Sequence, residues 1–354
     1  MKIKDFIDYE QPNEYIVESD RYSSKYSTPV LTAGQSFILG YTDESKGIYK
    51  KGPCIIFDDF TTSVHYVDFP FKVKSSAMKI LTTKSIADLK YCYYLLLSLS
   101  KMPPNHKRQW ISTTSEKNHL LPSIDKQISI VKQLDLISDT IAHYTNQIEN
   151  LDNLVKARFV EMFGDPDTNP KGWNECALSE KLNVVGGYAF KSDGFSEESG
   201  IPVLRIGNIN AGFFRPVNLV YWQEDESLDR YAMYPGDLVM SLTGTVGKDD
   251  YGNVCILGDD YDMYYLNQRN AKIEIIEGID KFYLSQLLKF EQIKKKLTGI
   301  SRGVRQANIS NKDILNLVVP VPPMELQSQF ATFVQQVDKS KYDDIRVEYK
   351  CQRK

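Results

Sequence analysis

The 354-residue sequence lacks the usual marks of a catalytic chain. Its four histidines are scattered along the chain. Its five cysteines form no C-x-x-C pair, which excludes a zinc knuckle or a redox motif of that spacing. Neither a G-x-G-x-x-G nor a Walker loop is present, so no dinucleotide, methyl-donor or ATP loop is indicated. An odd number of scattered thiols is typical of proteins of the reducing cytosol.

Long hydrophobic runs and a dominant charge are also missing. The longest apolar candidate, YCYYLLLSLS at 91–100, is shorter than the ~18 residues of a membrane span. The N-terminus, MKIKDFIDYEQ, has no apolar segment of a secretory signal, and we expect a cytoplasmic protein with no membrane partner. The net charge of −3 creates no overall attraction to a polyanion. Residues 289–305, however, hold six basic side chains and one acidic side chain.

What the sequence does contain is an internal repeat. TPVLTAG at 28–34 matches IPVLRIG at 201–207, with Pro, Val, Leu and Gly in the same places. Next, GPCIIFDDFTTS from Gly52 matches GDLVMSLTGTVG from Gly236, and each reads as a Gly-led strand that ends among Thr and Ser.

The order of motifs continues in parallel. A helix-like segment follows near 85–101 and again near 280–298. An Arg-Gln loop and an apolar run then appear as KRQWISTTSEKNHLLPSI and as SRGVRQANISNKDILNLVVPVPP. Finally, IVKQLD matches FVQQVD. Five matches in one order indicate a duplicated supersecondary plan.

A long helix is predicted after the first copy. It begins at Pro122, and its apolar positions alternate by four and three residues, as in a heptad seam. These positions are Ile130, Leu134, Ile137, Ile141, Tyr144, Ile148, Leu151 and Val155. Phe330, Val334 and Val337 begin the same seam in the second copy, which then loses it at Lys341. We expect the two helices to pair antiparallel as a coiled coil, the second being shorter and more polar.

The predicted fold class is α+β, with curled antiparallel sheets in two globular domains separated by long helices. The predicted organisation is a first domain at 1–121, a spacer helix at 122–163, a linker at 164–173, a second domain at 174–321, and a short second helix at 322–354.

Candidate catalytic groups are few. Acid-x-Lys triplets such as Glu44-Ser45-Lys46 arise freely in a chain with 43 basic and 46 acidic residues. Asp58 and Asp59 read as loop acids at a strand end rather than as cation ligands. We therefore predict no catalytic residue, no metal site and no cofactor bound by this chain.

Recognition of duplex DNA accounts better for two similar domains on a rigid spacer, because groove faces recur every ~34 Å. Arginine can contact phosphates or guanine edges, and Asn and Gln can read adenine edges. The candidate contacts of the first domain are Thr61, Thr62, Lys107, Arg108 and Gln109. The candidate contacts of the second domain are Arg205, Asn208, Ser241, Thr243, Thr245, Lys248, Asn267, Gln268, Arg269, Arg302, Arg305 and Gln306.

The chain resembles the specificity subunits of type I restriction–modification systems. The resemblance is carried by IPVLRIGNI, GDLVMSLTGTVG, YLNQRNAKI and SRGVRQANISNKDILNLVVPVPPMELQ, and by LPSIDKQISIVKQLD followed by VKARFVEMFGDP. It implies two target-recognition domains that each read one part of a split DNA sequence, and conserved helices that set the gap. The loss of the seam after Val337 departs from the family pattern.

The resemblance also implies partners. Such a subunit performs no chemistry itself and recruits two methylation subunits that methylate adenine with S-adenosylmethionine. Restriction subunits add ATP-driven translocation and cleavage, so S-adenosylmethionine, ATP and magnesium are expected on the partners. Two alternatives remain open: a self-contained DNA nuclease or methyltransferase, and a two-headed scaffold that binds proteins through its heptad helix.

Overall fold

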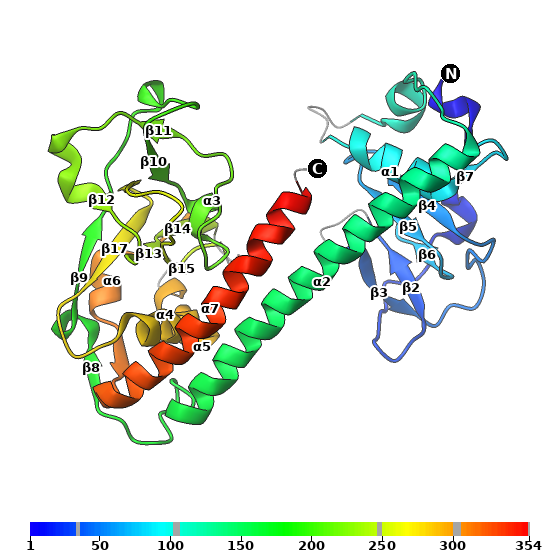
Figure 1. Ribbon diagram of the computed structural model, residues 1–354. Coiled ribbons are helices and arrows are strands. Elements are labelled where there is room, and N and C mark those ends of the chain that lie inside the picture. Colours follow the sequence, from blue (N-terminus) through cyan, green and yellow to red (C-terminus); the bar gives the residue numbers. More distant parts are fainter. Residues whose placement is uncertain (33–35, 102–106, 246–249, 300–305, 353–354) are drawn as a thin grey trace. The chain divides into compact units, whose positions relative to one another are not determined.

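A computed structural model describes residues 1–32, 36–101, 107–245, 250–299 and 306–352 (Figure 1), with only the backbone described at residues 306 and 342–352. The chain divides into two compact units, Met1–His143 and Tyr144–Lys354. The division falls inside the long helix α2 (Ile124–Phe163), so each unit holds one part of that helix. Within the described ranges, no helix is both long and apolar enough to cross a membrane.

The first unit is built on a four-stranded antiparallel sheet. In spatial order its strands are β1 (Ile7–Glu10), β7 (Met78–Thr83), β4 (Cys54–Asp58) and β5 (Val64–Val67). Successive side chains of a strand point to opposite faces, and both faces of β4 are covered. Ile55 and Phe57 pack with α1 (Leu89–Leu99), while Cys54 and Ile56 pack with Phe71 on the other face.

A smaller sheet and short helical turns complete this unit. The smaller sheet has the order β3 (Ile38–Thr42), β2 (Thr28–Leu31), β6 (Lys72–Val73). The turns are η1 (Ile3–Asp5), η2 (Pro12–Tyr15) and the π-helical η3 (Trp110–Thr114).

The second unit has a larger set of strands. Its main sheet has the order β15 (Val254–Ile256), β13 (Leu238–Ser241), β17 (Asn270–Ile275), β9 (Leu182–Gly186). A second sheet has the order β11 (Tyr221–Trp222), β10 (Ile201–Leu204), β16 (Tyr264–Leu266), β12 (Ala232–Met233). Two ribbons pair β14 (Thr243–Thr245) with β18 (Gln306–Asn308), and β19 (Val318–Pro320) with β8 (Glu175–Ala177).

Helices surround these strands. They are α3 (Ile206–Ile209), α4 (Lys281–Lys289), α5 (Glu291–Thr298), α6 (Asn311–Leu315) and α7 (Met324–Gln352). Short 3₁₀ turns occur at η4 (Leu178–Glu180), η5 (Ser192–Gly194) and η6 (Glu226–Tyr231).

The topology confirms that one plan occurs twice. The sheet β1-β7-β4-β5 of the first unit has the same pairing pattern as β9-β17-β13-β15 of the second. The first four residues of the matched motifs, Thr28–Leu31 and Ile201–Leu204, form β2 and β10, and each strand pairs antiparallel to one strand and parallel to another. The parallel pairs β2–β6 and β10–β16 correct the expectation of wholly antiparallel sheets. In each unit the chain passes through strands of the main sheet between the two strands of the parallel pair. This long connection provides the crossover that parallel pairing needs.

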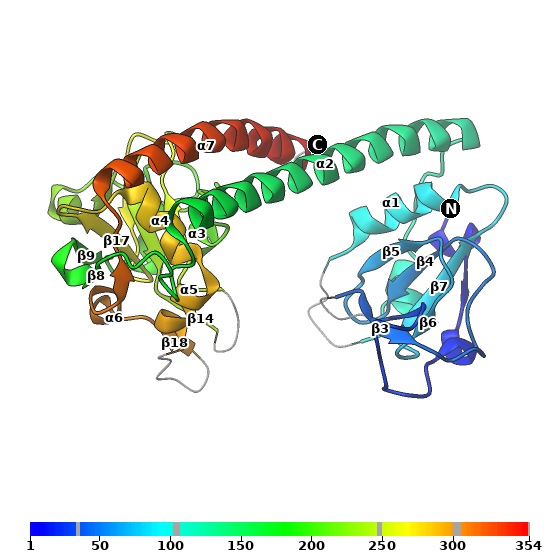
Figure 2. The ribbon, with the colours of Figure 1, turned by 90° about the horizontal axis from the view of Figure 1, so that it is seen from below.

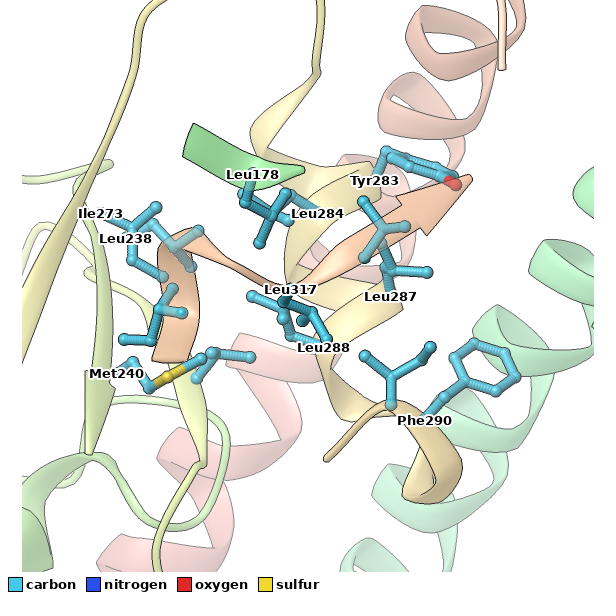
Figure 3. Packing of buried hydrophobic residues seen from close by; sticks show 14 of the residues in the cluster. Leu178, Leu238, Met240, Ile273, Tyr283, Leu284, Leu287, Leu288, Phe290 and Leu317 are labelled. Carbon is cyan, nitrogen blue, oxygen red and sulfur yellow. The ribbon is translucent and has the colours of Figure 1, made fainter. Parts of the chain in front are cut away.

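The core of the second unit lies between its main sheet and α4 (Figure 3). Asp280 caps α4 by accepting from the backbone N–H of Phe282 and of Tyr283. The helix then buries Leu284, Leu287 and Leu288 against the sheet.

The predicted helix at 280–298 is two helices in the structure. Phe290 separates α4 from α5 with an extended backbone, at φ −65° and ψ 130°. Its ring is buried and lies 4.8 Å from the ring of Phe159, measured between centroids. The chain therefore breaks the helix where an aromatic side chain turns toward α2.

Within the second unit, α2 and α7 pack side by side (Figures 1 and 2). Val155 and Phe159 share one core with Phe330 and Val334. The ring centroids of Phe159 and Phe330 are 5.5 Å apart. Eleven residues after Phe330 on α7, Lys341 pairs with Asp152, which lies seven residues before Phe159 on α2. Because contacts move back along α2 as they advance along α7, the helices are antiparallel here. The α+β class with long helices is therefore confirmed.

Candidate nucleic-acid interface

Exposed polar side chains of the second unit lie at the ends of neighbouring strands. We call this set the polar edge; it consists of Arg205, Thr245, Gln268 and Arg269. Leu204 of β10 pairs with Leu266 of the parallel β16, so the residues after both strands leave at the same end. Asn270 joins the two exits, since its Nδ2 donates to the Leu204 carbonyl at 2.7 Å. The Leu242 N–H donates to the Arg269 carbonyl at 2.8 Å, which brings the chain leading into β14 to this end.

Three other predicted contacts of this unit are buried. Asn208 accepts from the Arg205 N–H at 2.9 Å and donates through Nδ2 to two backbone carbonyls, each at 2.9 Å. The Ser241 hydroxyl accepts from the Asn253 N–H at 3.1 Å. Asn267 Oδ1 accepts from the Arg269 N–H at 3.3 Å. These side chains hold the loops that present the polar edge, and they are not themselves open to a ligand.

The remaining predicted contacts that the structure describes, Thr243 and Gln306, belong to the β14–β18 ribbon. Thr243 is half-buried, and its hydroxyl has no hydrogen-bond partner among the residues that the structure describes. The backbone of Thr245 pairs with that of Gln306. Three predicted contacts lie outside the described residues: Lys248, Arg302 and Arg305. Thr245 and Gln306 are thus paired at the point where the described chain adjoins the predicted basic loops.

In the first unit the predicted contacts divide in the same way. Lys107 and Arg108 are exposed, and Gln109 is half-buried with its Nε2 donating to the Lys107 carbonyl at 2.9 Å. The Thr61 hydroxyl donates to Asp58 Oδ1 at 2.8 Å. Thr62 is buried at a backbone φ of 60° and donates to the Lys101 carbonyl at 3.0 Å. Lys107 and Arg108 are therefore the side chains of this set that a ligand reaches most easily.

The loop that carries Arg108 is anchored by a fully buried carboxylate. Asp59 Oδ1 accepts from the N–H of Gln109 at 3.0 Å and of Trp110 at 2.7 Å. Its other oxygen lies 3.3 Å from Lys79 Nζ, and both side chains are excluded from solvent. Lys79 is held further by Gln11 Oε1 at 2.9 Å. A buried charge needs this kind of pairing. The ion pair therefore fixes the point at which the chain after Arg108 enters η3.

The described part of the basic segment, residues 289–299, lies beside a cavity. Lys289, Lys294 and Lys295 line a cavity of about 930 Å³, together with Lys156 of α2 and Lys341 of α7. Lys341 pairs with Asp152, and Lys295 with Glu291. Lys289 is exposed to solvent by its accessible surface, and it lines the cavity. Burial, reinforced by the charge of Lys341, lowers the pKa of Lys289. This part of the second unit is therefore a concave basic surface.

The arrangement offers donors and positive charge rather than groups for catalysis. Arginine presents a planar fork of N–H donors that fits phosphate oxygens or the guanine edge, and a glutamine amide fits the adenine edge. Across the described ranges, no group of three or more His, Cys, Asp or Glu residues could hold a metal ion. The geometry suits binding to a polyanion with base-edge readout.

Comparison with known proteins agrees with this geometry. Residues 170–346 match the family model described as the type I restriction modification DNA specificity domain. The chain belongs to the type I restriction–modification DNA specificity family. The matched range contains the whole polar edge. It also contains all the residues given above as lining the cavity except Lys156, and it leaves out the lining residues Asp152 and Asn153.

Relatives in the family extend the match. The EcoR124I/EcoR124II specificity subunit of Escherichia coli is 44% identical over 162 residues, covering 43% of this chain and 40% of that one. The MjaVIII specificity subunit of Methanocaldococcus jannaschii is 26% identical over 369 residues, covering 96% of this chain and 85% of that one. The crystal structure of an S subunit from M. genitalium has a TM-score of 0.59 at 14% identity, covering 99% of this chain and 92% of that one. It shows that the fold is that of a type I specificity subunit.

The sequence did not lead us to predict the ion pair between Asp59 and Lys79 in this specificity-family member, because Asp59 was interpreted as a loop acid. A signal was present: Lys79 lies within the apolar run MKIL, where strand alternation places it on the buried side. A lysine in a buried strand position requires a carboxylate partner. The neighbouring Asp58–Asp59 strand end offered one.

Proposed function

We propose that the chain is a DNA-recognition subunit that reads a split target and directs adenine methylation and restriction by partner subunits. Each unit reads one part of the target, the first with the loop around Arg108 and the second with the polar edge. The partners are double-stranded DNA, two methylation subunits and, in the full complex, restriction subunits. S-adenosylmethionine, ATP and magnesium bind on those partners, and the complex works in the cytoplasm.

The observation that carries the proposal is the repeated unit. Both units have the same main-sheet order and the same parallel pair, and both end in a proline that leads into a long helix. Two equivalent readers suit a target of two parts, since duplex DNA presents equivalent groove faces once per turn.

The paired helices set the distance between the two parts of the target. The seam residues of α2 that lie in the second unit, from Tyr144 to Val155, are all half-buried or buried, which supports an apolar face covered along this part of the helix. Val334 and Val337 are buried on α7. We propose that α2 and α7 form the antiparallel coiled coil of the spacer, with about 40 residues of α2 corresponding to roughly 60 Å.

The test is single-molecule methylation sequencing of a host with and without this gene. Methylated adenine at one split motif, lost on deletion, supports the proposal and identifies the target. Unchanged methylation, in a host where the chain is present and bound to a methylation subunit, would overturn it. Methylation or cleavage by the purified chain alone would favour the self-contained enzyme. Protein binding without any DNA recognition would favour the scaffold.

Two arginines refine the test. Restoring the gene as Arg108→Ala should relax one half of the motif, and Arg269→Ala should relax the other half. Each lost bidentate contact is worth about 1–3 kcal/mol of discrimination. Arg21→Ala is the matched control, because Arg21 is an exposed arginine of the first unit outside the Arg108 loop. Relaxation of the same half by both variants would contradict the assignment of one half to each unit.

A further inference from the structure

Each unit contains the same hydrogen-bonded joint between its globular body and the helix that leaves it. In the first unit Gln127, in the first turn of α2, is fully buried. Its Oε1 accepts from the N–H of Asp88 at 2.8 Å, and its Nε2 donates to the carbonyl of Pro122 at 2.8 Å. Gln127 Nε2 also donates to the carbonyl of Ile86 at 3.2 Å. Asp88 is the residue that caps α1, through the Tyr91 N–H.

The second unit repeats the contacts with the capping aspartate and with the proline. Gln327, in the first turn of α7, is fully buried. Its Oε1 accepts from the N–H of Asp280 at 2.8 Å, and its Nε2 donates to the carbonyl of Pro322 at 2.7 Å. Asp280 caps α4 through the N–H of Tyr283. One amide thus joins a capped helix of the body to the proline turn that starts the spacer helix.

Glutamine suits this position because its amide presents an acceptor and a donor at once. Removing it leaves a buried N–H and a buried C=O without partners, which a core position tolerates poorly. Val131 of α2 packs in the same core as α1 and adds apolar contact at the first joint. The other polar contact there, between Lys90 and Asp135 at 2.8 Å, is more exposed than the amide. Apolar packing is non-directional, so the buried amide is the contact at each joint that sets a defined direction for the helix as it leaves the body.

The direction of a long helix matters because of its length. A tilt of about 5° at the base of a rod of roughly 60 Å moves its far end by about 5 Å. One base pair adds ~3.4 Å along the duplex and roughly 35° of rotation. The displacement caused by a small change of helix angle at the joint is thus comparable to the length that one base pair adds to the spacer.

We propose that Gln127 and Gln327 are positioning residues that set which spacer length the subunit accepts. This inference rests on the proposed function, since it concerns the gap between the two parts of the target. The glutamines touch no base and leave the reading of each part unchanged. Their effect is to hold each reader at a fixed angle on its helix.

The test uses the complete complex in a host whose genome contains both parts of the motif at many separations. Gln127→Ala and Gln327→Ala are restored to a deletion strain, and methylation is scored at the native spacing and at one base pair more or less. We expect discrimination between spacings to fall about tenfold, the equivalent of roughly two lost hydrogen bonds. The sequence preference within each part should not change.

Matched controls are Gln133→Ala on α2 and Gln336→Ala on α7, because both glutamines are exposed on the same helices. Gln127→Met keeps the side-chain length without the amide, and it should reproduce the loss of spacing control while packing better than alanine. A uniform loss of methylation at all spacings in both the Ala and the Met variants would assign the glutamines a folding role only and overturn the proposal.

Failure of the inference is distinguishable from failure of the proposed function. If the wild-type gene produces no split motif, the function itself is wrong. If the wild type methylates a split motif and the variants keep its spacing discrimination, the function stands and the positioning role is overturned.

Discussion

Arg205 and Asn208 lie three residues apart at the start of α3, yet only Arg205 reaches solvent. The Arg205 side chain extends from the end of β10 with no ion pair among the described residues. Asn208 satisfies one N–H and two carbonyl groups inside the unit. Residue type alone therefore does not separate a DNA contact from a structural amide, because both are polar and follow a strand.

This difference predicts two phenotypes. Asn208→Ala should lower the free energy of unfolding by about 1–3 kcal/mol, because it leaves buried backbone groups unpaired. Arg205→Ala should change stability by less than about 0.5 kcal/mol and still reduce target methylation. Denaturant unfolding and methylation assays of both variants check this. Equal stability of the two variants would contradict the structural role of Asn208.

The buried pair of Asp59 and Lys79 predicts a coupled effect. Asp59→Leu alone should destabilise the chain by about 3–5 kcal/mol, because Lys79 keeps an uncompensated charge. The double variant Asp59→Leu with Lys79→Ala introduces the residues that the second unit has at the equivalent places. Leu242 follows β13 as Asp59 follows β4, and Ala271 lies in β17 as Lys79 lies in β7. It should recover part of the stability, while the Arg108 loop stays without its carboxylate anchor.

Unfolding and methylation measured on the same variants separate these two roles. Recovered stability with relaxed specificity in one half of the motif is the expected result. A double variant no more stable than Asp59→Leu would show that the charge of Lys79 is not the source of the loss.

At the scale of elements, local sequence patterns predicted the features that depend on local interactions, such as a long helix. The alternation of four and three residues predicted the long helix α2, because that spacing follows from helix geometry. The helix begins at Ile124, two residues after the predicted start at Pro122. The parallel pairing of β10 with β16 was not predictable in this way. Short strands such as Tyr264–Leu266 carry no signal of which neighbour they join, and that choice depends on packing of the whole unit.

The candidate site shows the same division. The structure places Gln268 and Arg269 at exposed positions between β16 and β17, and Lys107 and Arg108 at exposed positions before η3. Which side chains are exposed depended on hydrogen bonds to distant segments, such as that from Asn270 to Leu204. Periodicity contains no information about such contacts.

The packing of α2 on α7 gives a prediction at this scale. Phe159 is fully buried and its ring contacts those of Phe163, Tyr283, Phe290 and Phe330. Phe159→Ala should lower the free energy of unfolding by about 3–5 kcal/mol through the cavity it creates. Val160→Ala is the matched control, because Val160 is the next residue of α2 and is exposed. Comparable denaturation midpoints for the two variants would contradict the packing described here.

At the scale of the whole molecule, each unit has cores of its own. The clusters around Phe57 and around Phe71 use residues of the first unit, and those around Phe159, Phe214 and Phe190 use residues of the second. Units with separate cores can be exchanged without repacking one another. Because the net charge is −3, the proposed attraction to DNA depends on local basic surfaces rather than on the total charge.

Exchange of one reader should therefore change one half of the target. Replacing residues 1–121 with the equivalent segment of another family member should alter one part of the methylated motif and keep the other. The spacer length should also stay, because α2 and α7 are retained together with Gln127 and Gln327. Methylation sequencing of the host provides all three observations. The reciprocal exchange of residues 174–321 is the control, and it should alter the other part. A change in both parts after either exchange would mean that the two units do not read independently.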